Sequence, residues 1–409
     1  MKVWIKYLIG VVIGIGAAFL IPFDTVTGTS ILSFLSELFI RFGRYLVIPM
    51  VFCTAIVSFH KLRTSKTILK ATLWTAAIIV LSSVLLALIG LLSILIVKLP
   101  RIPITVAIPT ETKAIEIKEM ILSLFPASAF DALREGSFLL VSFILAALIG
   151  WESATDESLF KPVFNLADSL SQLFYNISVF FTEVMSVLII ALMCYWIVSF
   201  RSAFATGIYT PMIIMLAVDF VLVVGVIYPL LVRFICHDPH PYRVLYASIA
   251  PMILAFAGGD ANLVLPLSIR HGKESLGIKR GSSGFTYPLF SIFARGGSAL
   301  VTTIAFILIW RSYSRQSIPF SDVMMVYFIS LGLSFLLGAF PSGGSFILLT
   351  ILCQWYGKGF ESSYLLLEPA SIIMCSFATM FDTATAMVGS YIVAVKTKNV
   401  EHHTIQHFI

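Results

Sequence analysis

Long apolar stretches dominate this chain, and the first six of them look unbroken. They cover residues 3–23, 31–59, 68–97, 129–150, 159–200 and 211–236. A helix needs about 20 consecutive apolar residues to cross the hydrocarbon core of a bilayer. The pattern therefore predicts an all-α polytopic membrane protein, with the lipid bilayer as its main surrounding.

The apolar stretches after Arg243 differ, because glycine and polar residues interrupt them midway. Residues 248–269 are broken at 257–262 (AGGDAN), and residues 323–352 are broken at 341–345 (PSGGS). Each half is too short to span a bilayer. Irregular backbone at membrane depth is tolerated only where protein or a polar cavity surrounds it. We therefore expect two re-entrant helical hairpins that border a polar site.

Each interrupted stretch precedes one further apolar stretch, at residues 285–310 and 364–395. The whole pattern predicts eight transmembrane helices plus two re-entrant hairpins. Two hairpin-plus-helix units in corresponding positions are typical of inverted-repeat transporters, whose binding site lies where the repeats meet. Two ordinary helices that glycine residues kink are the alternative interpretation.

Composition and charge agree with a membrane protein. Of 409 residues, 59% are hydrophobic and 12% are charged, whereas soluble domains carry about 25% charged residues. The net charge of +6 comes from basic residues in short loops at 63–70, 233–243 and 396–398. By the positive-inside rule these loops and the C-terminus are cytoplasmic. The charge is explained by topology, so we expect no nucleic-acid partner.

Motifs for other chemistry are lacking in the sequence. No Walker loop, catalytic triad or dinucleotide fingerprint accompanies a strand–helix pattern, so we predict neither enzyme activity nor an organic cofactor. Cys236, His237, Asp238 and His240 imitate a metal cluster, but they lie in a short loop with two prolines, and we predict no metal site there.

Ionisable residues near the centres of the last segments are the main chemical feature. Arg295 is spaced to share one helical face with Ser291, Ser298 and Thr302. Asp382 belongs to a similar stripe in the final stretch, and Asp260 lies at the first interruption. Intramembrane ionisable residues usually mark a substrate or ion pathway. The alternative is a buried Arg295–Asp382 ion pair that only fixes helix packing.

The candidate binding residues come from both interruptions and from the two stretches that follow them. We expect Arg295 to bind a carboxylate, and Asp260 or Asp382 to carry a proton or to meet an ammonium group. Half-helix ends at the interruptions add favourable dipoles. The full candidate set is Asp260, Ala261, Asn262, Arg295, Ser298, Ser342, Gly343, Gly344, Ser345, Thr379, Asp382 and Thr385.

Several short motifs, taken in order, resemble the dicarboxylate/amino acid:cation symporter family, which contains the glutamate transporters. They are residues 44–52 (RYLVIPMVF), 125–133 (FPASAFDAL), 265–266 (LP), 340–344 (FPSGG) and 389–394 (GSYIVA). The resemblance covers nearly the whole chain. It implies a homotrimer in the cell inner membrane that transports a small polar or anionic solute by an elevator movement.

The resemblance also implies a division of each protomer. Residues 1–67 would supply scaffold helices 1 and 2, and residues 99–200 an external loop with scaffold helices 4 and 5. Residues 68–98 would supply helix 3 of the transport domain. Residues 201–409 would form the rest of that domain, with helices 6 to 8 and both hairpins.

Departures from the family pattern bear on the coupling ion. The family's serine-rich first tip is Asp260, Ala261 and Asn262 here, and its Asn-Met-Asp-Gly-Thr signature is replaced by residues 294–298 (ARGGS). Ala386 takes the position of a sodium-binding aspartate. Sodium needs several oxygen ligands, including carboxylates. We therefore expect sodium coupling to be lost or much reduced, with protons or the solute gradient as the driving force.

The resulting hypothesis is a secondary active transporter of a small amino acid, dicarboxylate or similar solute. In the resemblance, Ala378 occupies the position of the family's arginine that binds an acidic substrate. Asp382 occupies the position of an asparagine that contacts the substrate. The alternatives are a sodium-coupled glutamate or aspartate symporter, and a channel or sensor on the same scaffold.

Overall fold

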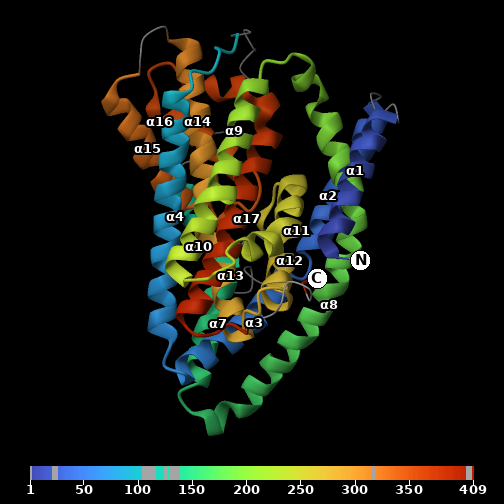
Figure 1. Cartoon of the computed structure of the whole chain (residues 1–409), viewed down its shortest axis with the longest axis vertical. Helices are drawn as coiled ribbons and strands as arrows, with labels where there is room; N and C mark the ends of the chain where they lie inside the picture. Colours follow the sequence, from blue (N-terminus) through green and yellow to red (C-terminus); the bar gives the residue numbers. More distant parts are fainter. Residues whose placement is uncertain are drawn as a thin grey trace.

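The structure is a computed structural model, and it describes residues 2–20, 26–103, 117–123, 128, 139–314, 318–401 and 408–409. Within these residues all the named elements are helical (Figure 1). Seven helices in the described part are long and apolar enough to cross a membrane. The all-helical architecture with several apolar helices is therefore confirmed, and the total of eight spans stays a prediction.

The first half of the chain consists of helices that match most of the predicted stretches. Their bounds are α1 (Val3–Leu20), α2 (Val26–Arg44), α3 (Val47–Thr64), α4 (Ile68–Ile96), α5 (Ile117–Ser123), α7 (Leu139–Ser153) and α8 (Glu157–Ala205). Most of residues 104–138, which include the predicted external loop and the 125–133 motif, lie outside the described residues.

The prediction of one unbroken span over residues 31–59 is wrong. Helix α2 ends at Arg44, and α3 begins at Val47 after a turn at Tyr45 and Leu46. Pro49 explains this break, because in a continuous helix its ring would clash with the carbonyl of Tyr45, four residues earlier. In the first turn of a new helix, a proline costs no hydrogen bond.

The second half begins with a long helical path. It runs through α9 (Thr210–Leu222), a π-helical segment η1 (Val223–Ile227) and α10 (Tyr228–Cys236). The remaining elements are α11 (Tyr242–Gly258), α12 (Ala261–Glu274), α13 (Arg280–Phe293), α14 (Gly296–Tyr313), α15 (Phe320–Ser334), η2 (Leu337–Ala339), α16 (Gly344–Tyr356), η3 (Ser363–Ala370) and α17 (Ser371–Lys396).

Both predicted interruptions are present. Hairpin 1, which we define as α11 and α12, turns at Gly259 and Asp260, and hairpin 2, α15 and α16, turns at residues 340–343. Gly259 and Gly343 have φ angles of +58° and +72°, a region that glycine adopts without steric cost. The positions of these two glycines in the sequence therefore favour a break at each hairpin tip. That the hairpins re-enter one side of a membrane stays a prediction.

The prediction of a single helix over residues 285–310 is also wrong. Helix α13 ends at Phe293 and α14 starts at Gly296, with Ala294 and Arg295 outside helical geometry. Ser291 therefore does not share one helical face with Ser298 and Thr302. The break permits close packing, since a Cβ atom on Gly297 would lie 2.5 Å from the Ala378 carbonyl oxygen.

The packing distinguishes an interior from a lipid-like surface. The 18-residue apolar window of Arg280–Tyr313 is 94% buried, whereas that of α1 is 28% buried. Helix α8 runs along one side of the molecule with α1 and α2 packed against it (Figure 1). Helices α14 and α17 pack together at the centre with α4, α13 and hairpin 2 around them. The two interruptions and the α13–α14 break therefore meet in the interior.

Candidate functional site

The tips of the two hairpins touch each other. Asp260 and Ser342 form an antiparallel bridge, and the backbone N–H of Ala261 donates to the Pro341 carbonyl at 3.0 Å. Two segments about 80 residues apart in sequence, which were both predicted to border one polar site, are thus neighbours. The contact closes the space between the hairpins at this point.

Asp260 is fully buried at the start of α12, where it does two things. Its Oδ1 accepts a hydrogen bond of 2.7 Å from the Leu263 N–H, and so caps the helix. Its Oδ2 forms an ion pair with Arg44, the last residue of α2. Sequence reasoning did not place Arg44 in the site. The available signals were a charge inside the apolar stretch of residues 31–59 and its place at the start of the motif at residues 44–52.

Asp382 lies in α17 opposite the break between α13 and α14. It accepts a hydrogen bond of 2.7 Å from the Gly297 N–H and one of 3.4 Å from the Ser298 hydroxyl. Arg295 Nη1 lies 3.7 Å from Asp382 Oδ2, and both residues are buried. The Arg295 Nε has no hydrogen-bond partner among the described residues. The Arg295–Asp382 ion pair, one of the two alternatives in the sequence analysis, is therefore present, and the Nε–H of Arg295 remains as an additional donor.

The three predicted ionisable residues, together with Arg44, thus form two separate ion pairs. Arg295 and Asp382 join the start of α14 to α17, while Asp260 is neutralised from α2. An unpaired charge at membrane depth costs several kcal/mol, which explains why each acid has a basic partner.

The other candidate residues lie around these pairs, mostly with local partners. Thr302 donates to the Ser345 carbonyl at 2.9 Å and so links α14 to hairpin 2. The Ser345 hydroxyl donates to the Cys375 sulfur at 3.4 Å, and Thr379 donates to the Cys375 carbonyl at 2.8 Å. Gly344 faces the Ser298 hydroxyl, since an added Cβ would lie 3.4 Å from it.

Two candidates are less available to a solute. Thr385 is buried, and its hydroxyl lies 2.5 Å from the Tyr228 hydroxyl and donates to the Phe381 carbonyl. Asn262 is also buried, in the first turn of α12. Tyr228 was missed by sequence reasoning, because a tyrosine inside an apolar stretch carries no distinguishing signal.

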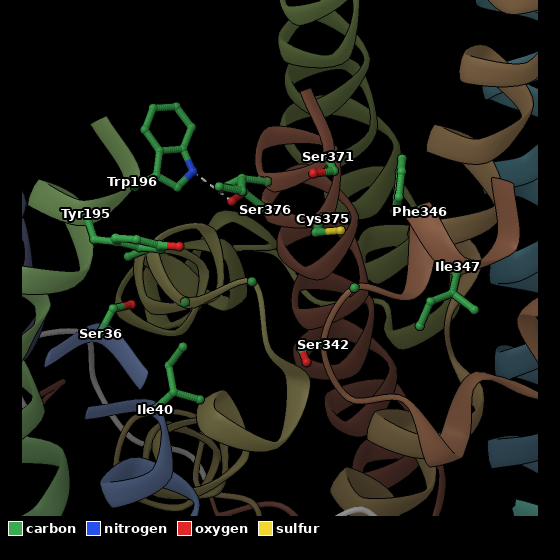
Figure 2. Close-up of a pocket in the computed structure, with 15 residues that line it drawn as sticks. Ser36, Ile40, Tyr195, Trp196, Ser342, Phe346, Ile347, Ser371, Cys375 and Ser376 are labelled. Atoms are coloured by element: carbon green, nitrogen blue, oxygen red, sulfur yellow. Dashed lines mark hydrogen bonds between the residues drawn. The ribbon is translucent and has the colours of Figure 1, made fainter. Parts of the chain in front are cut away.

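A cavity of about 330 Å³ lies beside the hairpin tips. Figure 2 shows Ser36, Ile40 and Tyr195 on one side of it, and Ser342, Phe346 and Cys375 on the other. Trp196 at its upper edge donates to the Ser376 hydroxyl at 2.9 Å. A volume of about 300–1,000 Å³ suits a small-molecule site. The first wall comes from α2 and α8, and the second comes from hairpin 2 and α17.

A second, much smaller cavity lies deeper, between α12, α13 and α17. It measures about 20 Å³, and Asp382, Ser291, Ser268 and Ala386 are among its lining residues. A polar space of this size can hold one water molecule. Of the predicted residues, Ser342 and Gly343 line the larger cavity, while Ala261 and Asp382 line the smaller one. Arg295 is among the lining residues of neither.

A further buried acid was missed by sequence reasoning. Asp219, in the middle of α9, accepts a hydrogen bond of 2.6 Å from Ser93 of α4. Its second oxygen is buried without a partner among the described residues. A single acid in an apolar stretch was a visible signal, and intramembrane acids are rare enough to be followed up.

Comparison with known proteins agrees with this arrangement. A neutral amino acid transporter B(0) from Homo sapiens is 28% identical over 122 residues, and the one from Oryctolagus cuniculus is 27% identical over the same length. Each match covers 30% of this chain and 22% of the relative. The pattern of the sodium:dicarboxylate symporter family matches residues 2–396. With two touching tips and buried polar residues inside an apolar helical body, the chain belongs to the sodium:dicarboxylate symporter family.

Proposed function

We propose that this protein is a secondary active transporter of a small neutral or acidic amino acid, or a dicarboxylate. The contact between the two hairpin tips beside a cavity carries this proposal. Family membership supports the class of solute, and the named relatives are neutral amino acid transporters. The solute would enter the cavity at Ser342 and Gly343 when the tips separate.

Arg295 is proposed to hold the carboxylate of the solute. Its guanidinium is buried, its contact with Asp382 is long at 3.7 Å, and its Nε has no partner among the described residues. A planar group with five donors can satisfy Asp382 and a second carboxylate together. Opening of hairpin 2 at residues 340–343 would be needed to connect Arg295 with the cavity.

An elevator movement of the hairpin-bearing part against α8 is part of the proposal. The interface includes two ion pairs: Arg270 of α12 lies 2.8 Å from Glu183, and Arg280 of α13 lies 3.2 Å from Asp168. The two acids are 15 residues apart on α8, which is about 22 Å along a helix. A slide of this length would carry one of the two arginines from its own acid to the other. Lys6 of α1 also pairs with Glu183 and would keep that acid compensated.

Coupling to protons rather than to sodium is proposed from the residues around Asp382. Ala294, Gly296 and Ala386 supply no side-chain oxygen where the resemblance places sodium ligands, and Arg295 adds a positive charge nearby. Asp260 and Asp382 are the proposed proton carriers. Uptake should then change less than tenfold when Na⁺ is replaced by choline, but should depend on an imposed pH gradient. Asp→Asn at the coupling residue should flatten the pH dependence.

Uptake by proteoliposomes tests the transport proposal. Purified protein is reconstituted with imposed Na⁺ or pH gradients, and labelled serine, aspartate and succinate are offered in turn. Ser342→Trp should fill the cavity and abolish uptake, whereas Ser321→Trp, on the exposed first turn of the same hairpin, should leave uptake unchanged. Equal uptake by the two variants would refute the proposal that the solute binds in the cavity. Currents that do not saturate would indicate a channel, and ligand binding without flux a sensor.

The remaining proposals concern assembly and location. We propose a homotrimer in the cell inner membrane, with the C-terminus in the cytoplasm and α1, α2, α3, α7 and α8 in the scaffold. Mass photometry of the protein in nanodiscs would give the subunit number directly. A cysteine introduced near Lys398 should react with a membrane-impermeant thiol reagent only from the cytoplasmic side.

A further inference from the structure

We propose that the groove between α10 and α11 binds one anionic phospholipid, with its phosphate at Arg233 and its acyl chains along the apolar wall. The α10–α11 groove has a volume of about 600 Å³, and its lining includes Val226, Leu230, Arg233, His240, Tyr242 and Arg243. This inference does not depend on the transported solute. It uses the loop whose cysteine and histidines imitate a metal cluster in the sequence.

The walls of the α10–α11 groove suit acyl chains. Val226 is 47% exposed, Leu230 is 45% exposed and Tyr242 is 61% exposed. In a membrane-embedded chain these side chains face lipid rather than water, so their exposure carries no hydrophobic penalty. Burial of an acyl chain in the groove adds packing contacts that loosely ordered bulk lipid does not make.

The head of the groove carries uncompensated positive charge. Arg233 is exposed and has no ion-pair partner among the described residues. Arg243 is neutralised, because its Nε lies 3.0 Å from Asp238 Oδ2. Burial opposes ionisation of Asp238, but hydrogen bonds from Tyr391 and the His240 N–H, and the Arg243 charge, lower its pKa. Asp238 is thus ionised and paired with Arg243, and the charge of Arg233 is available to bind an anion.

The N-terminus of α1 adds a second cation at the edge of the groove. The Lys2 ammonium donates to the Tyr246 hydroxyl at 3.1 Å, and Trp4 Nε1–H donates to the same oxygen at 3.0 Å. Tyr246 lines the groove. Tryptophan and tyrosine are enriched at the headgroup level, and basic pockets between transmembrane helices bind anionic headgroups. Along η1 and α10, Arg233 in the last turn and the apolar Leu230 and Val226 before it therefore follow the order of a phospholipid from head to tail.

The helix that forms the wall has an irregular backbone at this place. Residues Val223–Ile227 are π-helical, and Val226 from this segment lines the groove. Such bulges are uncommon and often lie at functional sites. The widened turn changes the direction in which Val226 and Leu230 project from α9–α10, which gives the groove its open wall.

Native mass spectrometry of the full-length protein tests this proposal. Dioleoyl phosphatidylglycerol and dioleoyl phosphatidylcholine are titrated separately, because they share acyl chains and differ in net charge. We expect at least about fivefold tighter binding of one phosphatidylglycerol molecule, and a loss of about fivefold in Arg233→Gln, from the contribution of one basic residue. Lys70→Gln, which removes an equally exposed charge from α4, should bind as the wild type does.

A second pair of variants separates the groove from surface charge alone. Leu230→Trp fills the groove without a change in charge and should weaken binding, whereas Leu69→Trp, on exposed α4, should have no effect. Equal binding of both lipids, or wild-type binding by Arg233→Gln and Leu230→Trp, would overturn the proposal. Full displacement of the lipid by millimolar inorganic phosphate would also overturn it, since the site would then recognise the anion alone.

Discussion

Two buried acids near the hairpin tips are held in contrasting ways. Asp382 is bound from within the core, by the Gly297 amide, Ser298 and an arginine whose side chain is 4% exposed. Asp260 caps its own helix and is paired with Arg44, whose side chain is 27% exposed and belongs to α2. The core pair can persist through a movement of the hairpins, whereas the tip pair must break if the tips leave α2.

The core pair should give the largest effects on stability. Arg295→Met strands the buried Asp382 carboxylate, and Asp382→Asn strands the guanidinium, so we expect each to cost about 3–5 kcal/mol. The double variant should recover much of this loss, because it leaves no unpaired charge. Thermal unfolding of purified protein measures these differences.

The same variants also separate packing from solute binding. If Arg295 holds the solute, a folded Arg295→Met protein should lose ligand-induced thermal stabilisation, and Arg295→Lys should regain little of it. Normal solute binding by a well-folded Arg295→Met protein would remove Arg295 from the site.

Gly297 contributes to the binding of Asp382 in the core, because the absence of a side chain lets its backbone N–H approach the Asp382 carboxylate. A Cβ atom there would lie 2.5 Å from the Phe381 Cβ and 2.8 Å from Asp382 Oδ1. Gly297→Ala should therefore cost about 1–3 kcal/mol. Gly332→Ala is the matched control, because nothing lies within 4 Å of its added Cβ and helical alanine is favoured. Equal melting temperatures for these two variants would contradict the close approach.

The tip pair should affect movement more than stability. Arg44→Met should cost about 1–3 kcal/mol, because the buried Asp260 carboxylate loses its ion pair but keeps its hydrogen bond from the Leu263 N–H. Asp260→Asn keeps the helix cap and removes the charge, whereas Asp260→Ala removes both and should cost about 1 kcal/mol more. We expect Asp260→Asn to change the rate of exchange transport. Its melting temperature should stay close to that of the double variant Asp260→Asn/Arg44→Met, because the ion pair is absent from both. A rate unchanged in both would mean that the tip pair does not restrain the hairpin.

Asp219 should give the smallest effect, although it too is a buried acid. Its side chain accepts a hydrogen bond from the Ser93 hydroxyl, and no cation pairs with it among the described residues, so a neutral amide leaves no opposite charge stranded. Asp219→Asn should alter the free energy of unfolding by less than about 1 kcal/mol. A loss as large as that in Asp382→Asn would show that Asp219 is ionised and paired in the folded protein.

Sequence patterns predicted the helices and both interruptions, because apolar length and glycine position are local properties. They failed at Pro49 and at Ala294–Arg295, because the total length of the apolar stretch does not show whether one helix or two helices form within it. For the site, the pattern identified Asp382 and Arg295 by their charge. It could not pair Asp260 with Arg44, since that contact joins segments more than 200 residues apart, and no spacing rule connects them.

Helix α8 has 49 residues, a length of about 74 Å, whereas the hydrocarbon core is about 30 Å thick. So long a helix must lean or extend well beyond the lipid, and its packing against α1, α2 and α3 sets its tilt. Asp168 and Glu183, which bind the hairpin-bearing part, are fixed to this helix and tilt with it. In the proposed elevator movement, a change in membrane thickness should therefore alter where these two acids lie relative to the bilayer, and lipid chain length should change the uptake rate.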